Sequence, residues 1–308
     1  MTASRLRPLR GIVPPMITPL SDLDQLDVDG LERLIEHILS GGVHGLFILG
    51  TTGEAPSLSY RLRRELIERT CRQVDGRVPV LVGITDTSLA ESRNMAQASA
   101  DYGADAVVLA PPYYFTIGQP ELIEHLDRLL DGLPLPLMLY NMPGLTKATF
   151  EPSTVEQLMQ RPGVIGIKDS SGDMDYLHQL VALAEERDDW GILVGPEILL
   201  PESVMMGATG GVNGGANLQP RLYVDLYEAA VAGDLQRVRQ LHRRVLELGK
   251  AIYQVGRYGS SIIKGLKCAL SLAGICDDVM ASPFNAFAEP ERQEVQRRLA
   301  ALNLEPVK

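Results

Sequence analysis

Short apolar runs rich in β-branched residues recur along the chain, and segments with helical periodicity separate them. In the helical segments apolar residues return every three or four positions, as they do over 31–39 and 122–130. Continuous apolar strands that alternate with helices are typical of a parallel sheet covered by helices. The pattern predicts eight strands, at residues 11–15, 45–50, 78–83, 106–110, 135–140, 164–168, 191–194 and 209–212.

Eight such units predict an α/β fold that closes as a (β/α)₈ TIM barrel. An open doubly wound sheet is the alternative, and it usually carries a G-x-G-x-x-G turn after its first strand. Here the first strand runs into Pro-Pro-Met-Ile-Thr-Pro over residues 14–19, which does not resemble that turn. We predict a catalytic barrel over residues 1–233, followed by a C-terminal helical layer over 234–308 that packs on the barrel.

The composition narrows the possible partners. A net charge of −10 argues against nucleic acid, because phosphate backbones are bound by clustered lysine and arginine. Three widely spaced cysteines and five histidines without paired spacing form no disulfide framework or metal motif. The chain shows no apolar run of about 20 residues, the length needed to cross a bilayer, and its N-terminus lacks a signal-peptide pattern. We therefore expect a cytoplasmic protein without a metal, a membrane or a nucleic-acid partner.

Polar residues collect where the predicted strands end. In a barrel of this kind the active site lies at the carboxyl ends of the strands, so these segments are expected to share one rim. The segments are Gly-Thr-Thr-Gly-Glu at 50–54, Pro-Pro-Tyr-Tyr at 111–114, Tyr-Asn-Met-Pro at 140–143, Lys-Asp-Ser-Ser at 168–171, Gly-Pro-Glu at 195–197 and Gly-Val-Asn-Gly-Gly-Ala-Asn at 211–217.

Lys168 is the residue that most needs an explanation, because it ends an apolar strand. Burying an ammonium is costly unless the charge is paired or lost. An ion pair with Asp169 or Glu54 is one explanation. The other is chemical: apolar walls disfavour the charged form, and a neutral lysine attacks ketones to form a Schiff base, beside which a C–C bond can break or form.

Two neighbours of Lys168 could assist this chemistry. Tyr140 ends the adjacent strand, about 4.8 Å away, where a phenol can transfer protons; the alternative is an aromatic cap on the core. Thr51 and Thr52 lie in a glycine-rich turn whose N–H groups can approach a carboxylate. A phosphate site is the alternative for this turn, but the sequence lacks the Walker lysine.

The ordered motifs GTTGE, PPYY, YNMP and GIKDS resemble the dihydrodipicolinate synthase / N-acetylneuraminate lyase family. The resemblance covers nearly the whole chain and implies a TIM barrel with C-terminal helices, a homotetramer and no cofactor beyond the covalent Schiff base. It also implies that Lys168 binds pyruvate or another 2-keto acid, that Tyr140 is the acid/base, and that Thr51 and Thr52 bind the keto-acid carboxylate. Thr51 would also link Tyr140 to Tyr114, which would complete the proton relay from a neighbouring subunit.

Further positions bear on the second substrate. Synthases of this family normally have an arginine two residues after the proline of the Y-N-x-P motif, whereas this chain has Leu145, as the sugar-acid lyases do. Glu197 and Ser170 match residues that bind substrate hydroxyls in those lyases, although Glu197 could instead cap the following helix. Gly195 and Val212, at the rim of the seventh and eighth strands, complete the predicted substrate-binding set.

These observations predict a lyase or aldolase that acts on a 2-keto-3-deoxy sugar acid or a related hydroxylated 2-keto acid through a Schiff base on Lys168. Two alternatives remain. One is 4-hydroxy-tetrahydrodipicolinate synthase, which condenses pyruvate with aspartate semialdehyde. The other is a catalytically silent barrel that binds a keto acid.

Overall fold

The computed structural model describes residue 6 and residues 8–302. Eight parallel strands form one sheet in the order β1-β10-β9-β8-β7-β6-β5-β4, so neighbours in the sheet are mostly neighbours in the chain. All eight predicted strands are confirmed. Their bounds are Gly11–Ile12 (β1), Leu46–Ile48 (β4), Val80–Gly83 (β5), Ala106–Leu109 (β6), Leu137–Asn141 (β7), Val164–Asp169 (β8), Gly191–Val194 (β9) and Gly210–Gly211 (β10).

The two edges of this sheet meet beyond the end of β1. Pro15 forms an isolated parallel bridge with Phe47 of β4. The N–H of Phe47 donates to the carbonyl of Pro14 at 3.0 Å, and the N–H of Met16 donates to the carbonyl of Phe47 at 2.8 Å. The sheet is therefore TIM-barrel-like, as the alternation of strands and helices predicts.

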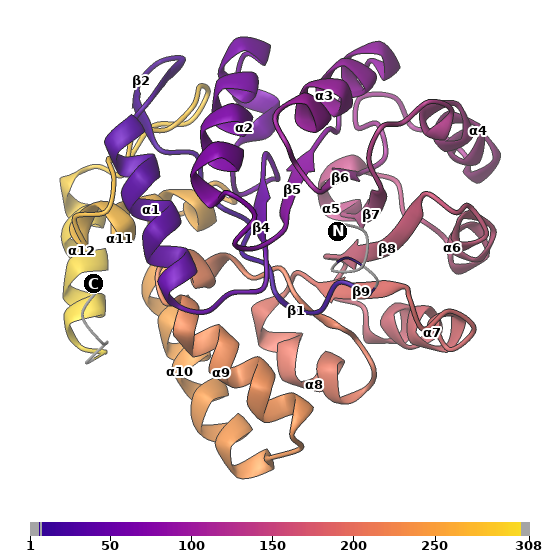
Figure 1. Cartoon of the computed structure of the whole chain (residues 1–308). Coiled ribbons are helices and arrows are strands. Elements are labelled where there is room, and N and C mark those ends of the chain that lie inside the picture. The colour runs from indigo at the N-terminus through magenta and orange to yellow at the C-terminus, as the bar shows by residue number, and fades with distance from the viewer. Residues whose placement is uncertain (1–5, 7, 303–308) are drawn as a thin grey trace.

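Helices surround the strands on the outside (Figure 1). Capping residues mark where several of these helices begin. In the first helix the Asp27 side chain accepts a hydrogen bond from the N–H of Gly30. Short helical turns η2 (Ala55–Ser57), α5 (Pro143–Thr146), η3 (Glu197–Leu199) and η4 (Gly214–Asn217) follow individual strands. The surrounding helices are α1 (Val28–Ser40), α2 (Tyr60–Val74), α3 (Leu89–Asp101), α4 (Gln119–Leu130), α6 (Pro152–Met159), α7 (Met174–Ala184), α8 (Leu200–Met205) and α9 (Pro220–Val231).

A small antiparallel hairpin, β2 (Leu20–Asp22) and β3 (Gln25–Leu26), follows β1 and was not predicted. Its strands have three and two residues. Segments this short contain too few positions to show a period of two, so hydrophobic patterning does not detect them.

Three helices follow α9: α10 (Leu235–Tyr253), α11 (Ser261–Leu272) and α12 (Glu289–Ala300). The predicted helical character of this segment is confirmed. Helix α10 packs against α9, and α11 and α12 pack against α10, outside the ring of barrel helices (Figure 1). The division of the chain at 233/234 stays a prediction, because one apolar cluster runs through both parts. Residues 1–5, 7 and 303–308, at the outer ends of the two predicted units, lie outside the described residues.

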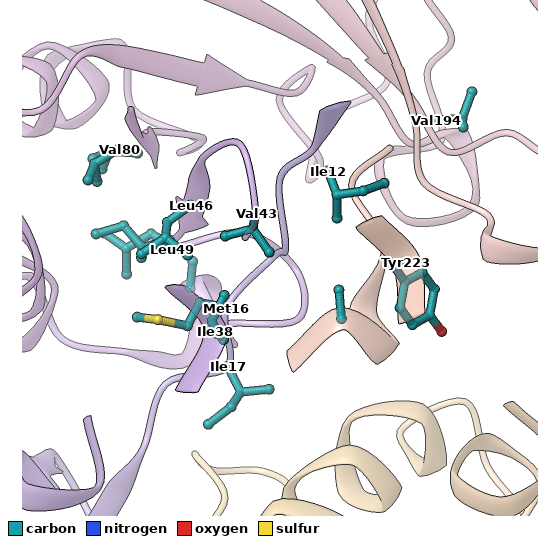
Figure 2. Close-up of a cluster of buried hydrophobic side chains, with 14 of the residues drawn as sticks. Ile12, Met16, Ile17, Ile38, Val43, Leu46, Leu49, Val80, Val194 and Tyr223 are labelled. Carbon is teal, nitrogen blue, oxygen red and sulfur yellow. The ribbon is translucent and has the colours of Figure 1, made fainter. Parts of the chain in front are cut away.

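Apolar side chains fill the space on both sides of the sheet. The larger cluster lies between strands and helices, and Figure 2 shows part of it, including Ile12, Leu46 and Tyr223. The smaller cluster belongs to the other face of the strands and includes Phe47 and Met138. The strands are apolar along their whole length because both of their faces are buried.

Strand β8 contains one residue more than its partner β7. Leu137 pairs with Val164, but the next residue, Met138, pairs with Gly166, so Ile165 has no counterpart. Such a bulge changes which face of the sheet the following side chains occupy. Gly166 lies close to the neighbouring strand: a Cβ atom there would lie 2.3 Å from the carbonyl oxygen of Gly191.

We predict that Gly166→Ala destabilises the protein by about 1–3 kcal/mol, because the added methyl group must displace backbone and not a flexible side chain. The matched control is Gly163→Ala just before the same strand, where the added Cβ would meet Leu130 Cδ2 at an ordinary 3.5 Å. The free energy of unfolding from urea titrations checks this. Equal stability of the two variants would contradict the close packing inferred at Gly166.

Candidate active site

Lys168 lies near the carboxyl end of β8, paired with Tyr140 of β7 and Leu193 of β9. The residue is 4% exposed. Its Nζ atom lies 3.9 Å from the ring centroid of Tyr140 and 5.1 Å from that of Phe47. Both rings belong to the smaller apolar cluster, so the amine reaches into that cluster. The faces of the two rings offer it electrostatic stabilisation in place of water.

The two carboxylates considered as ion-pair partners of Lys168 are bound elsewhere. Asp169 accepts hydrogen bonds from Asn141 Nδ2 at 2.8 Å and from Ser171 Oγ at 2.9 Å. Glu54 pairs with Lys267 at 2.6 Å. Across residues 8–302 the structure shows no ion pair between Lys168 and a carboxylate, and its amine contacts the rings of Tyr140 and Phe47.

Tyr140 is 6% exposed, and its hydroxyl oxygen lies 3.2 Å from Thr51 Oγ1. Burial by itself raises the pKa of a phenol. The positive charge of Lys168, with hydrogen bonds from Thr51, Lys168 and Ser170, outweighs this effect, so the pKa of Tyr140 falls below its ordinary value. A phenol of this kind gives up its proton more readily than a free tyrosine does.

Thr51 and Thr52 are half-buried in a tight turn over residues 50–54. The N–H of Glu54 donates to the carbonyl of Thr51 at 3.0 Å, and Thr18 Oγ1 donates to the carbonyl of Gly53 at 2.7 Å. The turn starts after Leu49 at φ +56° and ends at Glu54 at φ +57°. Non-glycine residues adopt such a left-handed backbone only where the surroundings impose it, so this turn is held tightly in shape.

Three further predicted residues lie at the same end of the neighbouring strands. Half-buried Ser170 follows β8 and contributes to the lowered pKa of Tyr140. Gly195 leaves space for it, since a Cβ on Gly195 would lie 2.2 Å from Ser170 Oγ. Val212 is buried in the smaller cluster and donates its N–H to the carbonyl of Val194 at 2.8 Å.

Tyr114 is separate from this group. It is 75% exposed, as is Phe115, and the two rings contact each other edge to face with centroids 5.1 Å apart. No hydrogen bond between Tyr114 and Thr51 occurs within the described single chain. An exposed aromatic pair is compatible with the expected contact from a neighbouring subunit, which stays a prediction.

Glu197 turns toward the C-terminal helices. Its Oε1 accepts from the N–H of Gly215 at 2.5 Å and from the hydroxyl of Tyr253 at 2.7 Å, and its Oε2 accepts from the hydroxyl of Tyr223 at 2.5 Å. Burial raises the pKa of this carboxyl, although the hydrogen bonds oppose the shift. Contact with substrate hydroxyls would require these bonds to be exchanged, and the substrate role of Glu197 stays a prediction.

Comparison with known proteins agrees with this arrangement of motifs. The family model described as the dihydrodipicolinate synthetase family matches residues 8–302. A curated relative, 4-hydroxy-tetrahydrodipicolinate synthase from Methanopyrus kandleri, is 32% identical over 97% of this chain and 98% of its own length. The chain belongs to the dihydrodipicolinate synthetase family.

Two solved structures extend this comparison. Dihydrodipicolinate synthase from Bacteroides thetaiotaomicron is 56% identical, with a TM-score of 0.93 over 96% of this chain and 99% of that one. A prophage protein of the family from E. coli K12, determined in complex with pyruvate, is 29% identical, with a TM-score of 0.91 over 97% and 100% of the two chains. The chain is thus a class I pyruvate aldolase, a carbon–carbon lyase of this family.

Enzymes of the dihydrodipicolinate synthetase family hold pyruvate as a covalent Schiff base on a lysine and use no metal or external cofactor. In this chain, residues 6 and 8–302 contain no group of three or more histidine, cysteine, aspartate or glutamate side chains that could bind a metal ion. A search of the same residues found no helix with the length and apolar character needed to cross a membrane.

Sequence reasoning missed several residues that shape the site. Asn141 directly follows Tyr140, Asp169 directly follows Lys168, and the two side chains hydrogen-bond to each other. Their places in the motifs Y-N and K-D could have indicated them. Phe47, under the amine of Lys168, is one apolar strand residue among many, and no local pattern distinguishes it. Lys267, the partner of Glu54, lies more than two hundred positions away in the chain.

We predict that Thr51→Val raises the pKa of Tyr140, because it removes a hydrogen bond that lowers this pKa. Thr51→Ser keeps the hydroxyl and is the matched control. Near-ultraviolet titration of tyrosinate, taken as the difference between each protein and its Tyr140→Phe counterpart, isolates this one phenol. An identical titration in the valine and serine variants would show that Thr51 does not act on Tyr140.

Proposed function

We propose that Lys168 forms the Schiff base with pyruvate and that the enzyme joins pyruvate to an aldehyde, or cleaves such an adduct. The observation that carries the proposal is the position of the Lys168 amine, buried against the ring of Tyr140, whose hydroxyl hydrogen-bonds with Thr51. The pyruvate complex of the E. coli family member supports the choice of keto acid.

The reaction follows from these contacts. The phenolate of Tyr140 takes a proton from the Lys168 ammonium, and the neutral amine adds to the ketone carbon of pyruvate. Tyr140 returns a proton to the hydroxyl of this adduct, which leaves as water, and an iminium forms. Tyr140 then takes a proton from the methyl carbon, which gives an enamine. The enamine carbon attacks the aldehyde, and Tyr140 returns this proton to the aldehyde oxygen. Hydrolysis of the iminium then frees the product and the lysine, and the reverse sequence is the cleavage.

The other predicted residues receive roles around this centre. Thr51 and Thr52, in the constrained turn, would bind the carboxylate of the keto acid through their hydroxyl and N–H groups. Ser170, Gly195 and Val212 would border the bound substrate. Tyr114 would join the proton relay of a neighbouring subunit in a cytoplasmic homotetramer, an assignment supported by its exposure.

The aldehyde is open to two assignments. The curated relatives support 4-hydroxy-tetrahydrodipicolinate synthase, because those compared over nearly their full length have this name. The solved structure with 56% identity is also named a dihydrodipicolinate synthase. Aspartate semialdehyde is therefore the first aldehyde to test with this enzyme.

Leu145 supports the second assignment, cleavage of a 2-keto-3-deoxy sugar acid. It occupies the place where such synthases normally carry an arginine for the carboxylate of the second substrate. Its apolar side chain is 53% exposed on α5 and offers a carboxylate no hydrogen bond. A hydroxylated substrate does not need this partner.

We predict that borohydride reduction in the presence of pyruvate adds one pyruvate-derived group to Lys168. Intact mass and peptide mapping locate the adduct. It should be absent in Lys168→Ala, shown to be folded by circular dichroism, and present in Lys147→Ala, which removes an exposed lysine of the same rim. A folded wild-type protein that forms no adduct would contradict the proposal and favour a silent keto-acid-binding barrel.

We predict that Leu145→Arg raises kcat/KM for aspartate semialdehyde about tenfold, because arginine supplies a charge-assisted, bidentate partner for its carboxylate. Leu145→Met is the size-matched control, and the exposure of residue 145 leaves space for both. Pyruvate consumption measures the synthase reaction, and pyruvate release from 2-keto-3-deoxy sugar acids measures the cleavage. If the arginine variant gains nothing, residue 145 does not face the second substrate.

A further inference from the structure

A buried ion pair lies behind the threonine turn, between the barrel and the C-terminal helices. Lys267 Nζ, on α11, lies 2.6 Å from Glu54 Oε1, and the two side chains are 0% and 1% exposed. Lys267 Nζ also donates to the carbonyl of Val279 at 2.6 Å. The N–H of Ala281 donates to Glu54 Oε2 at 2.9 Å. Each charged group thus has a partner in the other and in the segment that follows α11.

The position of Glu54 gives this pair a direct connection to the proposed keto-acid site. Glu54 ends the turn that carries Thr51 and Thr52, and its own N–H donates to the carbonyl of Thr51. Its backbone is left-handed, a conformation that glutamate does not prefer. The side chain of Glu54 therefore fixes the end of the turn from behind, while the half-buried threonines lie three and two positions before it.

We propose that Glu54 and Lys267 are positioning residues, which hold the turn so that Thr51 and Thr52 meet the carboxylate of the keto acid. The inference rests on the proposed function of Lys168 and the threonines, and it means that a residue of the C-terminal layer helps to shape the substrate site. Binding of the carboxylate and formation of the Schiff base then depend on different contacts. Carboxylate recognition depends on the ion pair, whereas the nucleophile on β8 is held by its own strand and by two aromatic rings.

The burial of the pair explains why one partner cannot be lost without effect. Desolvation lowers the pKa of Lys267, and the nearby Glu54 carboxylate opposes this shift. Removing either partner leaves a charge buried without its counterion, which is far more disruptive than replacing both. Glu54→Gln is therefore expected to displace the turn, and the double variant Glu54→Gln/Lys267→Met to displace it less.

The test compares two ketones that differ in the carboxylate. Borohydride trapping rates are measured with pyruvate and with acetone, which can form a Schiff base but has no carboxylate for the threonine turn to bind. In Glu54→Gln the ratio of the pyruvate rate to the acetone rate should fall about 10- to 100-fold, because small displacements of positioning groups have effects of this size. The acetone rate itself should stay close to that of the wild type.

Glu294→Gln is the matched control. Glu294 pairs with Arg298 at 2.7 Å within α12 of the same C-terminal layer, and within residues 8–302 it has no hydrogen bond or ion pair with Glu54 or Lys267. Its substitution should leave the ratio unchanged. Lys267→Met should lower the ratio of the pyruvate rate to the acetone rate, because it leaves Glu54 without its counterion. Lys267→Arg, which retains the charge, should lower this ratio less.

Each outcome decides a separate question. A wild-type protein without a pyruvate adduct overturns the proposed function and this inference with it. If the wild type reacts, an unchanged ratio in Glu54→Gln, or an equal loss of both rates, overturns the positioning role alone. If Glu54→Gln does not fold, the double variant replaces it in the test, and failure of that variant to fold assigns the pair to folding and overturns the inference.

Discussion

The amine of Lys168 lies among apolar side chains of the barrel sheet, and this burial is the constraint on which the rest of the site depends. The faces of Phe47 and Tyr140 stand where water would otherwise solvate the charge. The same contact brings the ammonium close enough to lower the pKa of Tyr140. One physical contact therefore both holds the lysine amine in place and lowers the pKa of the phenol beside it.

The backbone around this contact leaves little freedom. The extra residue in β8 sets the face on which Lys168 lies, and Gly166 allows the strand to approach Gly191 closely. Asn141 and Asp169, which directly follow Tyr140 and Lys168 in the chain, hydrogen-bond to each other. Preorganisation of this kind means that the reacting groups do not need to be ordered when the substrate binds.

The C-terminal helices are part of the framework of the rim and not only an outer layer. Glu54 and Lys267 connect α11 to the turn after β4, and Glu197 connects Tyr253 of α10 to the turn after β10. Both carboxylates are acceptors for groups far away in the chain. The helical layer, predicted from the helical pattern alone to pack on the barrel, therefore also contacts the turns at the rim, while the division at 233/234 stays a prediction.

The sequence by itself determined the eight strands, because strands buried on both faces are continuous apolar runs. It also determined that Lys168, Tyr140 and Thr51 share one rim, because parallel strands end on the same side. Only the tertiary structure decided the bulge in β8, the partner of Glu54 and the direction of Glu197. Each of these depends on contacts between distant segments. Local periodicity has no information about such contacts, since they form only when the sheet and helices pack.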